Sequence, residues 1–189
     1  MENAFVYRIA HDTNEARLTV LGVPDKSGIG AKIFHALAQA TIHVDMIIYN
    51  KVTNGSPNVS FIIPKADVLE GKAAAEAVAE KIGAKGVIVE ADIARLSVIG
   101  RGLHNPSGLV AKMFDAFGDE KINIQMISTS ETRISCLIKA KDMERAVSTL
   151  IKKFELDKIP GRDIDASPKE EIDFAIPFDA PFDYTLIHG

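Results

Sequence analysis

The sequence predicts an α+β protein built from two copies of one β-α-β-β-α-β unit, each a four-stranded antiparallel sheet backed by two helices in the ferredoxin-like arrangement. Three observations support this prediction. The chain repeats itself, each copy alternates between strand and helix periodicity, and one apolar segment near the N-terminus has no place in either copy. With 189 residues, 47% hydrophobic and 25% charged, the composition is that of a folded globular protein.

The internal repeat is visible in three segments of each copy. The matching pairs are Leu18-Thr-Val-Leu-Gly22 with Leu96-Ser-Val-Ile-Gly100, Ser27-Gly-Ile-Gly-Ala-Lys-Ile-Phe34 with Ser107-Gly-Leu-Val-Ala-Lys-Met-Phe114, and Ile42-His-Val-Asp-Met-Ile47 with Ile122-Asn-Ile-Gln-Met-Ile127. The offset changes only between predicted elements, and insertions confined to loops are what a duplicated fold tolerates.

The first copy is expected to contain six elements in the order strand, helix, strand, strand, helix, strand. Their predicted ranges are Arg17–Val23, Ile29–Ala40, Val44–Asn50, Asn58–Ile63, Asp67–Ile82 and Gly86–Glu90. Asp25 or Ser27 is expected to cap the first helix and Asp67 the second, because short polar side chains accept bonds from free helix amides. Gly83 is expected to end the second helix, and a turn around Asn54-Gly55 to join the two middle strands.

The second copy repeats this order but lacks its last strand. Its predicted elements are Arg95–Gly100, Leu109–Phe117, Ile124–Thr129, Arg133–Lys139 and Asp142–Phe154. Pro160-Gly161 stands where a fourth strand should begin. We expect the unassigned apolar segment Ala4–Ala10 to supply that strand and to join the two copies, with Ile172–Ile176 and Tyr184–Ile187 as alternatives.

The chain is therefore divided into four parts. These are an N-terminal strand segment (1–16), a first domain (17–91), a second domain (94–159) and an acidic C-terminal tail (160–189). The tail has two basic and seven acidic residues, a net charge of −5, which leaves +1 for residues 1–159. Its aromatic residues fit either an extension without fixed structure or docking on a neighbouring domain; they are Phe174, Phe178, Phe182 and Tyr184.

Composition also excludes several classes of protein. The nearly neutral body gives no basic footprint for nucleic acid, and an RNA-binding sheet would need stacking aromatics on its strands. No apolar run approaches the ~20 residues of a membrane span, and no signal-peptide pattern opens the chain. The single cysteine, Cys136, is expected in the core and suits a reducing compartment, so we expect a cytoplasmic protein. The five histidines are scattered, so no metal site is expected.

The loop before the first helix has the chemistry to bind a free amino acid. Helix N-terminal amides attract a carboxylate, Gly28 and Gly30 permit close approach to that backbone, and Asp25 offers an acceptor for an ammonium group. The alternative is that Asp25-Lys-Ser-Gly28 is only a helix cap in a surface turn.

Three segments carry a resemblance to a known family. Val20-Leu-Gly-Val-Pro-Asp-Lys-Ser-Gly28, Val44-Asp-Met-Ile-Ile48 and Asn123-Ile-Gln-Met-Ile-Ser-Thr-Ser-Glu131 are similar to the tandem ACT domains of aspartate kinase. The resemblance covers roughly Ala4 to Leu156. In that family this region is the C-terminal regulatory half of the enzyme, and in some bacteria it is a separate β subunit.

The resemblance implies an amino-acid-binding module that mediates feedback inhibition by lysine and/or threonine. It implies a homodimer formed through the sheets and a kinase domain or α subunit as partner. That kinase domain, with its ATP and Mg²⁺, is absent from this chain, so no catalytic residue or cofactor is expected here. Two alternatives remain, a stand-alone amino-acid sensor and a structural dimerisation module acting on another protein.

The resemblance also assigns the effector-binding residues. In the first copy these are Asp25, Ser27, Gly28, Gly30, Tyr49, Val52 and Ser60, and in the second copy of a partner chain Leu109, Val110, Met113, Asn123, Ile124 and Ser130. Two departures concern the pocket: Tyr49 stands where the family usually has glutamine, and the hairpin Thr53–Asn58 differs from the usual one. The second loop, His104–Gly108, lacks an acid equivalent to Asp25, so we expect it to be structural.

Overall fold

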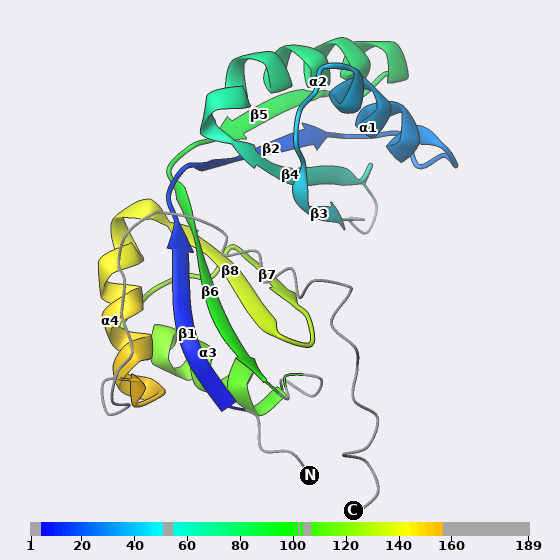
Figure 1. The fold of residues 1–189 in the computed structure, drawn as a ribbon. Coiled ribbons are helices and arrows are strands. Elements are labelled where there is room, and N and C mark those ends of the chain that lie inside the picture. The colour runs from blue at the N-terminus through cyan, green and yellow to red at the C-terminus, as the bar shows by residue number, and fades with distance from the viewer. Residues whose placement is uncertain (1–4, 51–54, 102, 104–106, 157–189) are drawn as a thin grey trace, which may run out of the picture.

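The computed structural model describes residues 5–50, 55–101, 103 and 107–156 (Figure 1). Its strands are β1 (Phe5–Asp12), β2 (Glu15–Leu21), β3 (Asp45–Asn50), β4 (Asn58–Pro64), β5 (Gly86–Glu90), β6 (Ile93–Arg101), β7 (Met126–Thr129) and β8 (Arg133–Lys139). Its helices are α1 (Ile29–Gln39), α2 (Val68–Ile82), α3 (Ser107–Asp119) and α4 (Met143–Lys153), with short 3₁₀ turns at Lys65–Asp67 and Ala140–Asp142. The α+β class and the element order predicted from the sequence are confirmed.

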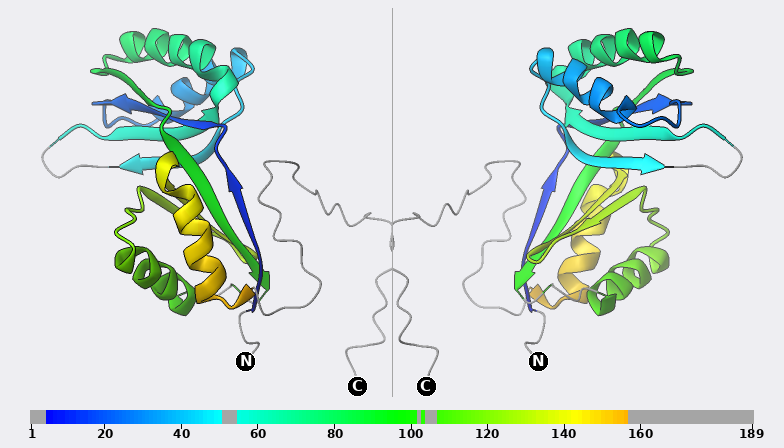
Figure 2. Two further views of the ribbon diagram at one scale, coloured as in Figure 1. Left: turned by 90° about the vertical axis from the view of Figure 1, so that its left-hand side faces the viewer. Right: turned by 90° about the vertical axis from the view of Figure 1, so that its right-hand side faces the viewer.

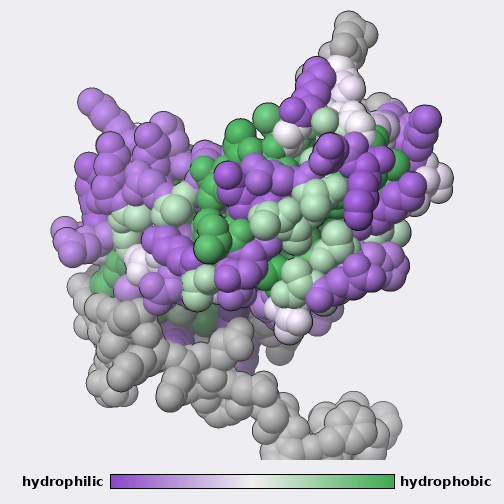
Figure 3. All heavy atoms as spheres, turned by 90° about the horizontal axis from the view of Figure 1, so that it is seen from above, coloured by the Kyte–Doolittle hydropathy of each residue, from purple (hydrophilic) through white to green (hydrophobic). Residues whose placement is uncertain are grey.

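The first domain is a four-stranded antiparallel sheet in the order β3-β4-β2-β5, covered on one face by α1 and α2 (Figure 1). Alternation along each strand decides which side chains enter the core. Leu18 and Val20 of β2 are fully buried against the helices, whereas Thr19 between them points to the opposite face. Seen from above, hydrophilic and hydrophobic side chains are interspersed over α1 and α2 (Figure 3).

The second domain is completed by the N-terminal strand, as predicted. Its sheet has the order β1-β6-β8-β7, so β1 fills the place beside β6 that β5 fills beside β2 in the first domain. β1 pairs antiparallel with β6 from Phe5 opposite Arg101 to Asp12 opposite Arg95, and Val6 is buried in the second core. The alternatives, 172–176 and 184–187, lie outside the described residues, as does the whole acidic tail.

The beginning of α1 differs from the prediction. Neither Asp25 nor Ser27 caps this helix: the N-cap position is Gly28, with φ 82° and no capping side chain. The left-handed conformation of a glycine turns the chain into the helix here, and the Asp25 carboxylate contacts another residue instead. Gly83, with φ 73°, ends α2 as predicted, and Asp67 occupies the N-cap position of α2 without a side-chain hydrogen bond.

The two cores differ at one aromatic pair. In the first domain Phe34 packs edge-on against Phe61, with ring centroids 5.8 Å apart. The repeat places Phe114 and Cys136 at the corresponding positions of the second domain. Cys136 is fully buried, as predicted, and Phe114 is 47% exposed. The duplicated fold has therefore retained its architecture while its core packing diverged.

The chain crosses between the domains twice, between β1 and β2 and between β5 and β6 (Figures 1 and 2). Beside these crossings the helix-free faces of the two sheets meet. A separate apolar cluster forms there from both domains; its members are Ile62, Ile93, Met126 and Leu137, with Met46 and Ile48 packed against it. We call this cluster together with the two crossings the junction.

Candidate functional site

Asp25 and Tyr49 form the polar centre of the predicted site in the first domain. Asp25 is exposed in the loop after β2, and Tyr49 lies near the end of the edge strand β3. The Tyr49 hydroxyl donates a hydrogen bond to Oδ1 of Asp25 at 3.3 Å. Tyr49 keeps half of its surface exposed. The structure therefore brings together two residues 24 positions apart, one of them the predicted acceptor for an ammonium group.

The N-terminus of α1 lies directly after this loop and is open. A Cβ added at Gly28 or Gly30 would meet no atom within 4 Å, and Ser27 is exposed. The first turn of α1 has neither an acidic residue nor a capping side chain. Free amides and the positive end of a helix favour a carboxylate at such a position.

The Ser60 hydroxyl does not belong to the polar centre formed by Asp25 and Tyr49. It opposes Thr19 on the helix-free face of the sheet, and the two hydroxyl oxygens lie 2.8 Å apart. Ser97 and Ser135 make the same contact at 2.8 Å in the second sheet. The hydroxyl of Ser60 thus belongs to a repeated sheet contact rather than to the surface around Asp25. Val52 lies outside the described residues.

The predicted second-domain residues lie on α3 and around β7. Asn123 and Ser130 are exposed, Leu109, Val110 and Ile124 are half-buried, and Met113 is fully buried. The Met113 side chain belongs to the core, and the Ser130 hydroxyl accepts from the Arg133 amide at 3.1 Å to close the β7–β8 hairpin. Of the second loop, 104–106 lie outside the described residues and Ser107 begins α3.

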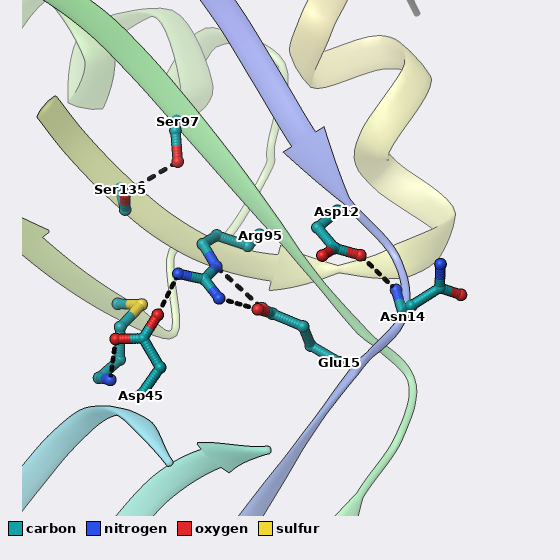
Figure 4. A network of polar contacts seen from close by, with 8 residues as sticks. Asp12, Asn14, Glu15, Asp45, Arg95, Ser97 and Ser135 are labelled. Carbon is teal, nitrogen blue, oxygen red and sulfur yellow. Dashed lines mark hydrogen bonds and ion pairs between the residues drawn. The ribbon is translucent and has the colours of Figure 1, made fainter. Parts of the chain in front are cut away.

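A polar network at the junction was not predicted from the sequence (Figure 4). Arg95 of β6 forms an ion pair with Glu15 of β2 through two of its nitrogens, with Nε 2.9 Å from Glu15 Oε2, and its third nitrogen lies 2.5 Å from Oδ2 of Asp45 in β3. The repeat does indicate the position of this arginine, since Arg17 and Arg95 are equivalent in the two copies. Arg17, however, pairs with Glu90 inside its own sheet, so the partners of Arg95 could not be transferred from one copy to the other.

The described residues offer few other groups for metal binding, membrane insertion or nucleophilic chemistry. No three His, Cys, Asp or Glu side chains in that part of the chain gather to hold a metal ion, and none of its helices is long and apolar enough to cross a membrane. Burial raises the pKa of the Cys136 thiol from 9.0 to about 12, so this thiol is a poor nucleophile near neutral pH.

Comparison with known proteins agrees with this architecture. The ACT domain family matches residues 18–81 and 96–154, one match in each domain. The chain is 41% identical to a chain in the crystal structure of aspartokinase alpha and beta subunits, covering 80% of this chain and 99% of that one with a TM-score of 0.75. It is 38% identical to the regulatory subunit of aspartate kinase from Thermus thermophilus, covering 79% and 99% with a TM-score of 0.74. The chain belongs to the ACT-domain family, as a tandem regulatory part of aspartate kinase.

The curated relatives of this tandem ACT chain are longer proteins. It is 38% identical over 157 residues to the aspartokinase of Pseudomonas aeruginosa, a match that covers 83% of this chain and 38% of that protein. It is 39% identical over 158 residues to the aspartokinase of Helicobacter pylori, covering 84% and 38%. The tandem ACT chain thus spans 38% of the length of these relatives.

Proposed function

We propose that this chain binds lysine and/or threonine and thereby restrains the kinase activity of aspartate kinase, which phosphorylates the side chain of aspartate. The contact between Asp25 and Tyr49 beside the open end of α1 carries the proposal. An amino acid has an ammonium group for Asp25 and a carboxylate for the α1 amides, so this surface matches both of its charges.

We propose that two copies of this chain form a homodimer through their sheets, and that this dimer binds a kinase domain or a catalytic subunit. The near-complete coverage of regulatory subunits by this chain supports the proposal. In such a dimer the second-domain residues of one protomer face Asp25 of the other. An amino acid that binds one arrangement of the dimer more tightly shifts the kinase toward that arrangement, with a typical coupling of about 1–3 kcal/mol.

Thermal unfolding of the full chain with millimolar L-lysine, L-threonine or L-methionine tests this function. A ligand at ~100 times its Kd adds about 2.7 kcal/mol of stability, which raises the Tm of a protein of this size by about 5–10 °C. We expect a rise with lysine or threonine and none with the D-enantiomers. Unchanged Tm values throughout would overturn the binding proposal and favour a structural dimerisation module.

Two matched variants locate the binding. Asp25→Asn keeps the size of the side chain but removes its charge, and hydrogen bonds to charged groups are worth about 1.5–3 kcal/mol. We therefore expect at least about tenfold weaker binding by this variant. Asp119→Asn makes the same change at the exposed end of α3 and should respond like the wild type. Equal responses of all three proteins would contradict the role of Asp25.

A further inference from the structure

Besides the apolar cluster and the two crossings, a guanidinium group links the two domains at the junction. Arg95 belongs to the second domain, and its three nitrogens contact two carboxylates of the first, Glu15 and Asp45. The Arg95 and Glu15 side chains are 18% and 8% exposed, whereas that of Asp45 is 48% exposed. The pair with Glu15 is therefore the more buried contact, and the same guanidinium also binds the more exposed Asp45 (Figure 4).

Asp45 fixes the beginning of β3. Its Oδ2 binds Arg95, and its Oδ1 accepts a hydrogen bond from the Met46 amide at 2.7 Å. Met46 has φ 45°, an uncommon conformation for a residue other than glycine, and the pairing of β3 with β4 shifts register between Asp45 and Ile48. The irregular start of this strand is thus held by a side chain that is itself bound to the second domain.

The same strand carries the proposed effector site at its other end. Tyr49 lies four residues after Asp45 and donates its hydroxyl to Asp25. Met46 and Ile48 pack on the junction cluster, where they lie with Met126 of β7. β3 and β7 are edge strands of their sheets, and β7 lies between Ile124 and Ser130, two of the predicted binding residues of the second domain. Both predicted half-sites are therefore anchored at one junction.

We propose that Arg95 is a positioning residue for the effector site: through Asp45 it holds β3, and with it Tyr49, and it couples amino-acid binding in the first domain to the second domain. This inference rests on the proposed function for its ligand. Arg95 itself lies at the opposite end of β3 from Tyr49 and acts only through that strand. A guanidinium can serve two carboxylates at once because its donors form a rigid fork, which a lysine ammonium cannot reproduce.

The decisive variant is Asp45→Asn in the full chain. Asparagine keeps an oxygen for the Met46 amide but loses the ion pair with Arg95, while the buried pair with Glu15 remains. The matched control is Glu90→Gln, which removes the pair with Arg17, a contact of similar exposure within the first sheet. Arg95→Lys is the second variant: its binding and exchange should change in the same direction as those of Asp45→Asn, and its Tm should fall further because it also weakens the buried pair with Glu15.

Three quantities are measured for each protein: Tm, the Kd for L-lysine and L-threonine by calorimetry, and amide hydrogen exchange. We expect Asp45→Asn to weaken binding about fivefold or more, to speed exchange at Ile48–Asn50 without ligand, and to abolish ligand-induced protection of β7. Its Tm should stay close to that of Glu90→Gln, whose Kd and exchange should match the wild type. Wild-type binding and exchange in Asp45→Asn, or equal changes in Glu90→Gln, would overturn the inference.

The two proposals fail in different ways. If the wild type binds neither amino acid, the proposed function is wrong, but exchange at Ile48–Asn50 in the ligand-free variants still decides whether Arg95 positions β3. If the wild type binds and Asp45→Asn binds equally well with unaltered exchange, the function stands and the positioning role is wrong.

Discussion

Removal of β1 should destabilise the second domain and leave the first intact. A chain shortened to begin at Asn14 retains Glu15 and all of β2 but loses the strand that pairs with β6. Val6 is buried in the second core and Ile9 packs against it. Full burial of one such side chain is worth about 1.5–3 kcal/mol. Because Ile9 is only half-buried, we expect a loss of about 2–4 kcal/mol, a large part of the 5–15 kcal/mol typical of a domain.

Amide hydrogen exchange under native conditions separates the two domains. We expect protection to fall at β6 and β8 and to remain at β2 and β4, and urea unfolding to show an earlier transition for the second domain. A chain that begins at Phe5 keeps all of β1 and should match the full protein. Full protection at β6 in the shortened chain would refute the reasoning and indicate that another segment, such as 172–176 or 184–187, fills the edge of that sheet.

Two further predictions concern buried side chains on the two faces of the second sheet. The pKa of the Cys136 thiol is raised from 9.0 to about 12. At pH 8 its thiolate fraction is therefore about a thousandfold below that of a thiol with a pKa of 9.0. Alkylation of Cys136 should be slow in the native protein and fast in urea. The neutral thiol is favoured in the folded state, so its contribution to stability is complete below pH 9 and is lost as the pH rises toward 12; urea midpoints across that range measure this. Ser97→Ala should cost about 1–3 kcal/mol because it leaves the buried Ser135 hydroxyl without this partner. The double variant with Ser135→Ala should cost less than the two single changes together, and simple additivity in urea unfolding would contradict this.

The fold was predictable because its determinants are local or repeated. Alternation in β2 and helical spacing in α1 identify these elements, and the duplication identifies their counterparts. The assignment of the N-terminal segment to the second sheet followed from one missing strand. The cap of α1 was not predictable in this way, because the Asp25 side chain is bound by Tyr49, a residue distant in sequence.

The site was predictable only in part. The family resemblance pointed to Asp25 and Tyr49, which the structure brings into contact. It also included Ser60, whose hydroxyl lies on the other face of the sheet, a fact that depends on strand register. The Arg95 network joins three strands of two domains. Equivalent arginines in the repeat reveal the position, but neither periodicity nor spacing could reveal the partners of the second one.

Chemical-shift mapping of the labelled full chain during titration with L-lysine and with L-threonine tests the central claim most directly. We predict saturable shifts with at least one of them, largest at Ser27–Gly30 and at Ile47–Asn50, where the carboxylate and ammonium groups are expected to bind. Absent shifts, or shifts confined to surfaces remote from α1 and β3 such as the outer face of α4, would contradict it.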